Sequence, residues 1–198
     1  MKKYAFDLDG TVTKVEILPL LAKELDLLEE MKILTDLTLR GKIPFEKSFK
    51  LRYLVLRNIP LDRIREIMEK VKLDKNIVDF IHNNKECCAI VTGNLDCWIE
   101  PIIKKLGCQS YSSVSKIDKN GNPILTEILD KGAAIRQMKL EGNKIIAIGE
   151  SFSDVTMFKE ADVSIAYGGV HRPVDAVISI SDYFVFDSNE LCQLLKMI

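Results

Sequence analysis

The sequence predicts a doubly wound α/β fold with a mostly parallel sheet, and two features of its apolar patterning lead to this. Short runs of hydrophobic residues recur along the chain and end in small or acidic residues, which is typical of strands buried on both faces of a parallel sheet. Stretches with helical patterning separate several of these runs, and this alternation indicates a Rossmann-like core. The predicted strands are residues 4–6, 87–91, 145–148, 163–167 and 183–186, and the predicted helices are residues 95–106, 131–140 and 154–161.

One long stretch, residues 14–75, interrupts the alternation because it contains no convincing strand. Gly, Asn and Pro residues divide it into amphipathic helical segments. The sequence therefore predicts an α/β core of residues 1–13 and 76–198, with a helical domain of residues 14–75 inserted after the first strand. A strong turn signal within residues 110–126 predicts a β-hairpin. The four predicted helices of the inserted domain are residues 17–28, 30–40, 44–56 and 61–70.

Composition and charge exclude several classes of protein. The chain has 198 residues, 47% of them hydrophobic, and a net charge of −1, which excludes wholesale disorder and gives no reason to expect a nucleic-acid partner. No apolar run approaches the ~20 residues of a membrane span, and Asp7 and Asp9 stand where a signal peptide needs an apolar stretch. The five cysteines include no C-x-x-C pair, which fits a reducing compartment. We therefore expect a cytoplasmic protein with no nucleic-acid or membrane partner.

The strongest chemical signal is Asp-Leu-Asp-Gly-Thr at residues 7–11, directly after the first predicted strand. Gly10 permits a turn that lets Asp7 and Asp9 face one cavity. Paired carboxylates repel each other, and carboxylate and carbonyl oxygens suit Mg²⁺. One carboxylate can attack phosphorus and form an aspartyl-phosphate, while the other protonates a leaving oxygen and later takes a proton from water. A solvated turn capped by aspartates is the alternative interpretation, but this five-residue motif is far more specific than a bare D-x-D.

Three further signals lie at predicted strand ends or helix starts, where the ligands of doubly wound folds bind. Residues 92–94, Thr-Gly-Asn, offer a hydroxyl and backbone N–H groups to an anion at a helix N-terminus, or they simply cap that helix. Lys131 can neutralise a phosphate, or it is a surface lysine. Glu150 and Asp154 can complete a metal site, or they are acids favoured at a helix start. Each signal is weak alone, but their order along the chain is informative.

In this order the signals resemble the four motifs of the haloacid dehalogenase superfamily of phosphotransferases, over essentially the whole chain. The motifs are Asp7-x-Asp9-Gly-Thr11, Thr92, Lys131, and Glu150 with Asp154. The resemblance implies that the inserted helices form the type 1 cap of this superfamily. It also implies a Mg²⁺-dependent phosphomonoester hydrolase that works through an aspartyl-phosphate.

Within the superfamily, the chain is most similar to the phosphoserine phosphatase branch. Residues 41–52, Gly-Lys-x-x-Phe-Glu-x-Ser-x-x-x-Arg, resemble its cap segment, in which the phenylalanine shields the site and the arginine takes the substrate carboxylate. Glu16 stands where the branch has a glutamate for the substrate amino group. The substrate-binding residues implied by the resemblance are Thr11, Glu16, Phe45, Arg52, Gly93, Asn94 and Ser153.

The resemblance also implies the catalytic roles. Asp7 is the expected nucleophile and Asp9 the expected acid and then base, while Thr92 and Lys131 hold the phosphoryl oxygens. The cap is expected to close while the intermediate forms and to open for its hydrolysis. The implied Mg²⁺ ligands are Asp7, Asp9 through its backbone carbonyl, and Glu150, with Asp154 supporting them.

Three residues depart from the pattern of the branch. Glu150 replaces an aspartate that is a direct Mg²⁺ ligand in the family, Ser153 stands where asparagine is frequent, and Asn94 stands where glycine is frequent. Two alternatives therefore stay open: an enzyme for another small phosphate, such as a sugar or alkylamine phosphate, and a weakly active binder of a phosphorylated ligand. The expected partner is in each case a small phosphorylated metabolite, and the expected assembly is a monomer or a homodimer.

Overall fold

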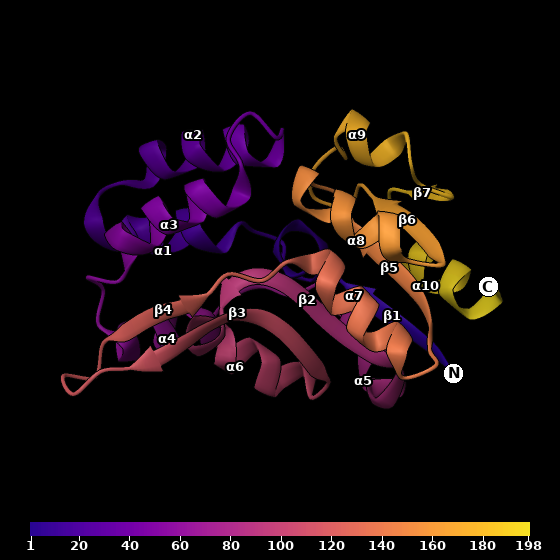
Figure 1. The fold of residues 1–198 in the computed structure, drawn as a ribbon, viewed down its shortest axis with the longest axis horizontal. Helices are drawn as coiled ribbons and strands as arrows, with labels where there is room; N and C mark the ends of the chain where they lie inside the picture. The colour runs from indigo at the N-terminus through magenta and orange to yellow at the C-terminus, as the bar shows by residue number, and fades with distance from the viewer.

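A computed structural model describes all of residues 1–198, and a seven-stranded sheet runs through its centre (Figure 1). The strands are β1 Lys2–Phe6, β2 Cys88–Leu95, β3 Gln109–Ile117, β4 Pro123–Glu127, β5 Lys144–Gly149, β6 Val163–Tyr167 and β7 Tyr183–Val185. Their order is β4-β3-β2-β1-β5-β6-β7, and every neighbouring pair is parallel except β3 with β4. This arrangement confirms the predicted doubly wound α/β fold.

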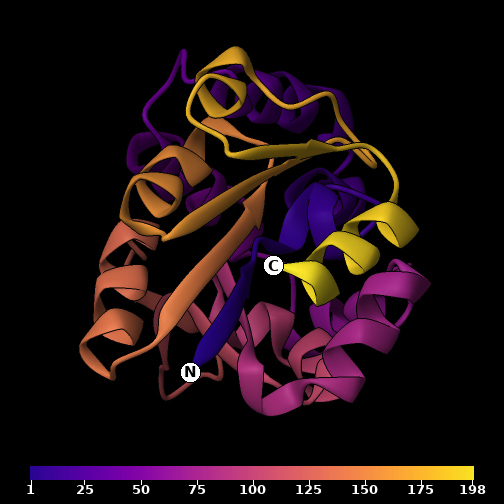
Figure 2. The same cartoon turned by 90° about the vertical axis from the view of Figure 1, so that its right-hand side faces the viewer.

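Six helices cover the two faces of the sheet. They are α5 Lys75–Asn83, α6 Asp96–Leu106, α7 Lys131–Leu140, α8 Val155–Glu160, α9 Asp175–Ile178 and α10 Ser188–Met197. Because alternate strand residues point to opposite faces, Phe6 and Ile90 pack with α5, α6 and α10, whereas Ala5 and Ala89 pack with α7, α8 and α9. Figure 2 shows α7 and α8 on one side of the strands and α5 and α10 on the other. The three helices predicted in this part of the chain are confirmed to within one residue at each end.

Between β1 and β2 the chain forms four further helices, which we call the helical segment: α1 Ile17–Ala22, α2 Leu28–Leu39, α3 Phe45–Leu56 and α4 Leu61–Glu69. The first three lie beyond the carboxyl ends of the central strands (Figure 1), and α4 packs against α6. The prediction of one helix over residues 17–28 is wrong. That helix stops at Ala22, and Asp26 then takes a left-handed conformation with φ 54°, which aspartate tolerates better than most residues.

The two stretches of chain that join the helical segment to the sheet run side by side. Thr13 and Leu73 form an antiparallel bridge. The N–H of Asp74 donates to the carbonyl of Val12 at 2.8 Å. These bonds tie the start and the end of the helical segment to one point beside β1. The division of the chain into two domains stays a prediction.

The predicted hairpin is confirmed as β3 and β4, and a buried tyrosine of α3 holds it. The hydroxyl of Tyr53 donates to the carbonyl of Pro123 at 2.8 Å and accepts from the N–H of Leu125 at 3.1 Å. The Tyr53 ring also stacks on Trp98 of α6, with 6.2 Å between ring centroids. The helical segment is thus attached to the hairpin and to α6.

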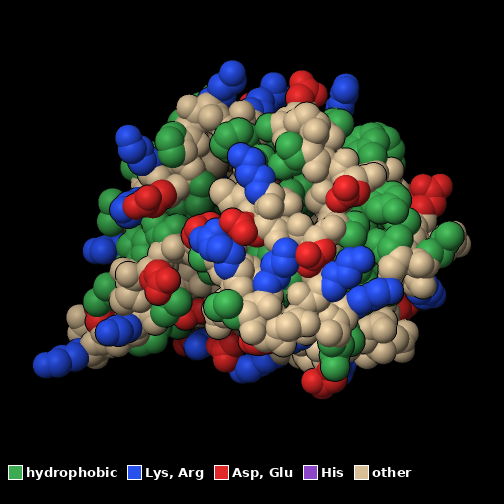
Figure 3. Space-filling view, turned by 45° about the vertical axis from the view of Figure 1, so that its right-hand side comes forward, with side chains coloured by type: hydrophobic (Ala, Val, Ile, Leu, Met, Phe, Trp, Pro, Cys, Tyr) green, Lys and Arg blue, Asp and Glu red, His purple; other side chains and the backbone are tan.

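Charged side chains of both signs are interspersed on the face that Figure 3 draws, with apolar side chains between them. The whole chain contains 28 basic and 29 acidic residues, so the two signs nearly balance. None of the helices has the length and apolar character that crossing a membrane requires.

Replacing Tyr53 with Phe is expected to destabilise the fold. The substitution removes a hydroxyl and leaves two backbone groups, of Pro123 and Leu125, without that partner; buried unpaired groups of this kind lower the free energy of unfolding by about 1–3 kcal/mol. Urea unfolding measures the change. Tyr111→Phe is the matched control, because its hydroxyl bonds only the exposed Gln109 side chain and its loss should change the free energy by less than about 0.5 kcal/mol. Equal effects of the two substitutions would contradict the structural role of Tyr53.

Candidate active site

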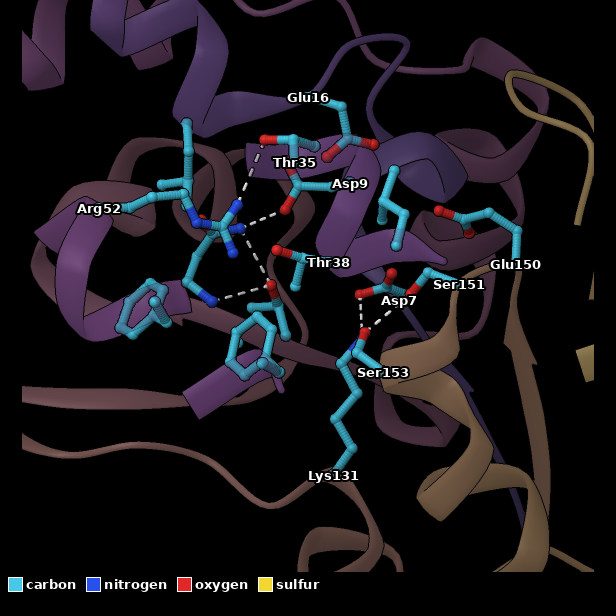
Figure 4. A pocket seen from close by; sticks show the side chains of 17 residues that line it. Asp7, Asp9, Glu16, Thr35, Thr38, Arg52, Lys131, Glu150, Ser151 and Ser153 are labelled. Atoms are coloured by element: carbon cyan, nitrogen blue, oxygen red, sulfur yellow. Dashed lines mark hydrogen bonds and ion pairs between the residues drawn. The ribbon is translucent and has the colours of Figure 1, made fainter. Parts of the chain in front are cut away.

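The polar residues that the sequence analysis singles out meet at the carboxyl ends of three adjacent strands (Figure 4). Asp7 follows β1, Thr92 lies in the second half of β2, and Glu150 follows β5. Together with side chains of α1, α2 and α3 they line a cavity of about 50 Å³. Adjacent parallel strands end at the same edge of a sheet, so the strand order itself places these residues together.

A turn after β1 brings both aspartates of the first motif to the cavity. Gly10 makes this turn with φ 68°, a left-handed conformation that glycine adopts without steric cost. The backbone is extended at the preceding Asp9, with ψ 133°, so the segment Leu8–Val12 is an irregular turn. A Cβ atom on Gly10 would lie only 2.6 Å from Oε1 of Glu150, so the bare glycine also makes room for that carboxylate. As a result, Asp7 and Asp9 both line the cavity.

Below the cavity, one buried lysine joins two buried carboxylates. Nζ of Lys131 lies 2.6 Å from Oδ1 of Asp7 and 2.6 Å from Oδ1 of Asp154. Lys131 is the first residue of α7, and the side chain of Asp130 caps that helix. Asp154 is held by a capping box with Ser151, whose N–H donates to Oδ2 of Asp154 at 2.9 Å.

Burial and mutual repulsion raise the pKa of two carboxyl groups in this cluster, those of Asp7 and Glu150. The pKa of Asp7 lies well above its usual range because of burial and then of Asp154, although Lys131 opposes the shift. Burial, followed by Asp7 and Asp154, also raises the pKa of Glu150. Burial alone would lower the pKa of Lys131, but Asp154 and Asp7 outweigh burial and raise it, so the ammonium stays charged. The cluster therefore contains three carboxyl groups, of Asp7, Glu150 and Asp154, and one positive charge, that of Lys131.

This shortage of positive charge fits a divalent cation. Oxygen atoms of Asp7, Glu150 and Asp154 lie within 4.8 Å of one another, and all three residues are buried. Oε2 of Glu150 accepts from the hydroxyl of Thr11 at 2.6 Å, whereas the buried Oε1 has no hydrogen-bond partner. Carboxylate oxygens are the side-chain ligands that Mg²⁺ prefers. These oxygens fit the Mg²⁺ that the resemblance implies, with Glu150 in place of an aspartate.

Asp9 lies between the sheet and the helical segment. Its Oδ1 accepts from the N–H of Ile17 at 2.7 Å, and its Oδ2 accepts from the side-chain amide of Asn94. Burial, and then the nearby carboxylate of Glu16, raise the pKa of Asp9 to about 7. A carboxyl group with such a pKa can donate a proton near neutral pH and take one back.

The prediction that the second strand ends at residue 91 is wrong, because β2 continues to Leu95. The hydroxyl of Ser113 on β3 donates to the carbonyl of Gly93 at 2.7 Å, which holds this part of the strand in the sheet. Residues 92–94 therefore lie in a strand. The anion-site interpretation placed them at the start of a helix, and this placement is wrong. Gly93 has a packing role as well, since a Cβ atom there would lie 2.1 Å from the ring of Phe45.

The helical segment supplies the opposite wall of the cavity (Figure 4). Arg52 of α3 is only 4% exposed, and its guanidinium donates to the hydroxyl of Thr35 at 3.3 Å and to the carbonyl of Ser48 at 3.4 Å. It forms no ion pair with any carboxylate of the chain. Burial lowers the pKa of Arg52 to about 10, although Asp9 and Glu16 oppose the shift.

Two residues beside the cavity are not among the predicted site residues. Nε2 of His171 lies 3.2 Å from Oε1 of Glu16, an ion-pair distance, although the two atoms are not aligned for a hydrogen bond; the contact raises the pKa of His171. The ring of Phe152 rests on Gly41 at the end of α2, where a Cβ atom would lie 2.6 Å from the ring. Phe152 begins a single 3₁₀ turn after β5 and His171 lies in a loop after β6, so neither carries a periodic or spacing signal.

The structure brings most of the predicted site residues to one cavity. Two of them lie behind its wall: Thr11 bonds Glu150, and Asp154 bonds Lys131. The predicted residues that line the cavity are Asp7, Asp9, Glu16, Phe45, Arg52, Thr92, Gly93, Asn94, Lys131, Glu150 and Ser153. What each of them binds stays a prediction.

Known proteins resemble the chain in sequence. The profile of haloacid dehalogenase-like hydrolases matches residues 4–159. The phosphoserine phosphatase of Methanocaldococcus jannaschii is 28% identical over 181 residues, which cover 84% of this chain and 85% of that protein. The phosphoserine phosphatase of Archaeoglobus fulgidus is 25% identical, over 82% of this chain and 51% of that protein.

Solved structures resemble this chain in fold. A substrate-bound phosphoserine phosphatase complex matches with a TM-score of 0.83 at 24% identity, over 100% of this chain and 99% of that one. A phospho-aspartyl intermediate analogue of phosphoserine phosphatase matches with a TM-score of 0.81 at 24% identity, over the full length of both chains. The structural likeness establishes the fold, and the profile match over most of the chain establishes the family. The chain belongs to the haloacid dehalogenase-like hydrolases, among which it is phosphoserine phosphatase-like.

Proposed function

We propose that the chain hydrolyses a small phosphate monoester that carries a carboxylate, with O-phosphoserine as the leading candidate, through an aspartyl-phosphate on Asp7. The observation that supports this most is the buried guanidinium of Arg52, which lines the cavity without an ion-pair partner. A buried charge is unfavourable unless an opposite charge meets it. The carboxylate of a bound substrate supplies that charge.

Glu16 supports an amino group on the same substrate. It lies in the wall that also contains Arg52, and its buried Oε1 has no hydrogen-bond partner. Phosphoserine carries an ammonium and a carboxylate on one carbon, so both groups can meet this wall while the phosphate faces Asp7. The names of the relatives agree with this substrate.

His171 favours a second candidate. Its ring lies 3.2 Å from Glu16, so the Glu16 carboxylate has a cationic neighbour whenever His171 is protonated, without any ammonium of a substrate. A phosphate ester with a carboxylate and no amino group, such as 3-phosphoglycerate, is the alternative that this contact favours.

In the proposed reaction, Asp7 attacks phosphorus as the bond to the leaving oxygen breaks. Lys131 engages Oδ1 of Asp7 and leaves Oδ2 free for the attack. Asp9 gives its proton to the leaving oxygen and then takes a proton from the water that hydrolyses the aspartyl-phosphate. Thr92 and the remaining N–H of Lys131 hold phosphoryl oxygens. Mg²⁺, held by Asp7, Glu150 and Asp154, would supply further positive charge for those oxygens.

Asp7→Asn is expected to abolish phosphate release with Mg²⁺ from a panel of small esters, because an amide is too weak a nucleophile to form the intermediate. Asp9→Asn is the informative comparison. With p-nitrophenyl phosphate, whose leaving group needs no proton, Asp7 should still be phosphorylated while the activation of water is lost. Intact-protein mass spectrometry should then detect phosphate retained on Asp9→Asn and none on Asp7→Asn. Undiminished turnover by purified Asp7→Asn would overturn the mechanism.

Arg52→Ala is expected to lower kcat/KM for phosphoserine by about 10- to 100-fold. This is the change that corresponds to the binding free energy of a lost hydrogen bond between charged groups. Hydrolysis of phosphoethanolamine, which has the amino group but no carboxylate, should be affected much less. The exposed Arg40→Ala is the control and should change neither rate. Equal losses on both esters would argue against a carboxylate site at Arg52. Comparison of phosphoserine with 3-phosphoglycerate in the native enzyme decides between the two candidate substrates.

Mg²⁺ is expected to raise the thermal unfolding midpoint of metal-free protein, by about 2–4 °C per kcal/mol of binding free energy. Folding raises the pKa of Asp7 and Glu150, so metal-free protein loses stability as the pH rises above their ordinary values of 3.8 and 4.5. The Mg²⁺ shift should therefore be larger at about pH 8 than at about pH 5. Differential scanning calorimetry of Asp154→Asn should show the shift reduced, whereas exposed Asp36→Asn should retain it. A full shift in Asp154→Asn would exclude this cluster as the Mg²⁺ site.

A further inference from the structure

The carboxylate of Asp9 is fixed by donors from opposite sides of the cavity. The N–H of Ile17, at the start of α1, donates to Oδ1 at 2.7 Å, and the side-chain amide of Asn94, on β2, donates to Oδ2. With a donor on each oxygen, rotation of the carboxylate breaks at least one hydrogen bond. Asp9 is thus held in a single orientation.

The same asparagine also orients the hydroxyl of Thr92. The backbone N–H of Asn94 donates to Oγ1 of Thr92 at 3.2 Å, and its side-chain amide donates to the same atom at 3.1 Å. A threonine hydroxyl has two acceptor sites and one proton. With both acceptor sites used, the hydroxyl proton of Thr92 is free to point at a phosphoryl oxygen in the cavity.

The two donors to Asp9 differ in how firmly they are placed. Asn94 is buried in β2, which pairs directly with β1, and Ser113 of β3 holds the adjacent carbonyl of Gly93 at 2.7 Å. Ile17 belongs to the helical segment, whose position relative to the sheet also sets the size of the cavity. Of the two donors, only Asn94 belongs to the sheet, in the strand next to β1, which Asp7 directly follows.

We propose that Asn94 is a positioning residue whose side-chain amide holds Asp9 for proton transfer, and that it does not bind the substrate. This inference rests on the proposed phosphatase function. In the first step the oxygen–phosphorus bond of the ester breaks, its electron pair goes to the leaving oxygen, and the carboxylic proton of Asp9 moves to that oxygen as the Asp7–phosphorus bond forms. A strongly basic leaving alkoxide needs this proton, whereas p-nitrophenolate does not.

Misalignment of Asp9 therefore has a kinetic signature that depends on the leaving group. Asn94→Ala is expected to lower kcat/KM, which reports the steps up to phosphorylation of Asp7, by about 10- to 100-fold on the best alkyl phosphate, part of the usual contribution of a general acid to that step. On p-nitrophenyl phosphate, kcat/KM should fall by less than about 3-fold, because general acid catalysis adds little to phosphorylation by this ester and the backbone N–H of residue 94 still donates to Thr92. The exposed hairpin variant Asn122→Ala is the control. Equal losses on both esters, or no loss on either, would overturn the positioning role.

A double substitution separates positioning from substrate binding. If Asn94 acts through Asp9, then adding Asn94→Ala to Asp9→Asn should cause little further loss of kcat/KM on the alkyl ester. If Asn94 binds the substrate, the two losses should multiply, and the inference fails.

A crystal structure of Asn94→Ala tests the inference without any turnover. The Asp9 carboxylate is expected to rotate away from its native orientation or to occupy more than one. An Asp9 side chain unchanged from the native protein would overturn the inference even if the phosphatase function holds. If the native protein releases no phosphate from any ester, the proposed function fails, while a displaced Asp9 in the variant still supports Asn94 as the residue that positions it.

Discussion

The two ion pairs that Lys131 forms with Asp7 and Asp154 hold the centre of the molecule together. They join the end of β1, the start of α7 and the turn before α8, three elements that are far apart in the sequence. Removing one partner from a buried pair leaves an uncompensated charge, which costs about 3–5 kcal/mol. Neighbouring side chains complete the arrangement. Thr11 bonds Glu150, and Ser151 forms a capping box with Asp154. The same burial that makes the cluster hard to dismantle concentrates negative charge where a cation and a phosphoryl group can bind.

Small side chains in the sheet bring the lysine within reach. Ala5 pairs in register with Ala89 on one side and with Ala147 on the other, and all three lie on the face covered by α7 and α8. Alanines at these positions let the helices approach the sheet closely, so the first turn of α7 lies directly below Asp7. On the opposite face the strands carry larger residues, such as Phe6 and Ile90, and the helices there contribute to the main core.

Local pattern was sufficient to predict the order of strands and helices, the hairpin, and the places of Asp7 and Glu150 directly after strands. The predictions of Glu16, Phe45 and Arg52 in the cavity wall came from the resemblance to the family. Local pattern failed where tertiary contacts decide the outcome. Gly93 and Asn94 are poor strand formers, yet they lie in β2 because its pairing with β3 resumes at Leu95 and the Ser113 hydroxyl of β3 donates to the carbonyl of Gly93. A helical pattern of apolar residues continues across Asp26, but the backbone there is left-handed. The bond from Asn94 to Asp9 joins residues on different elements, and spacing along the chain encodes no such pair.

The helical segment is attached unequally at its two ends. Near the hairpin, Tyr53 makes two buried hydrogen bonds and stacks on Trp98. At the other end, the 45% exposed ring of Phe152 rests on the bare backbone of Gly41, a contact without directional bonds. Separation at the Phe152 end returns a ring to water, whereas separation at the Tyr53 end breaks hydrogen bonds, so the first is the less costly opening. The helical segment is therefore expected to open first at the mouth beside Phe152, while the contacts of Tyr53 keep its other end attached.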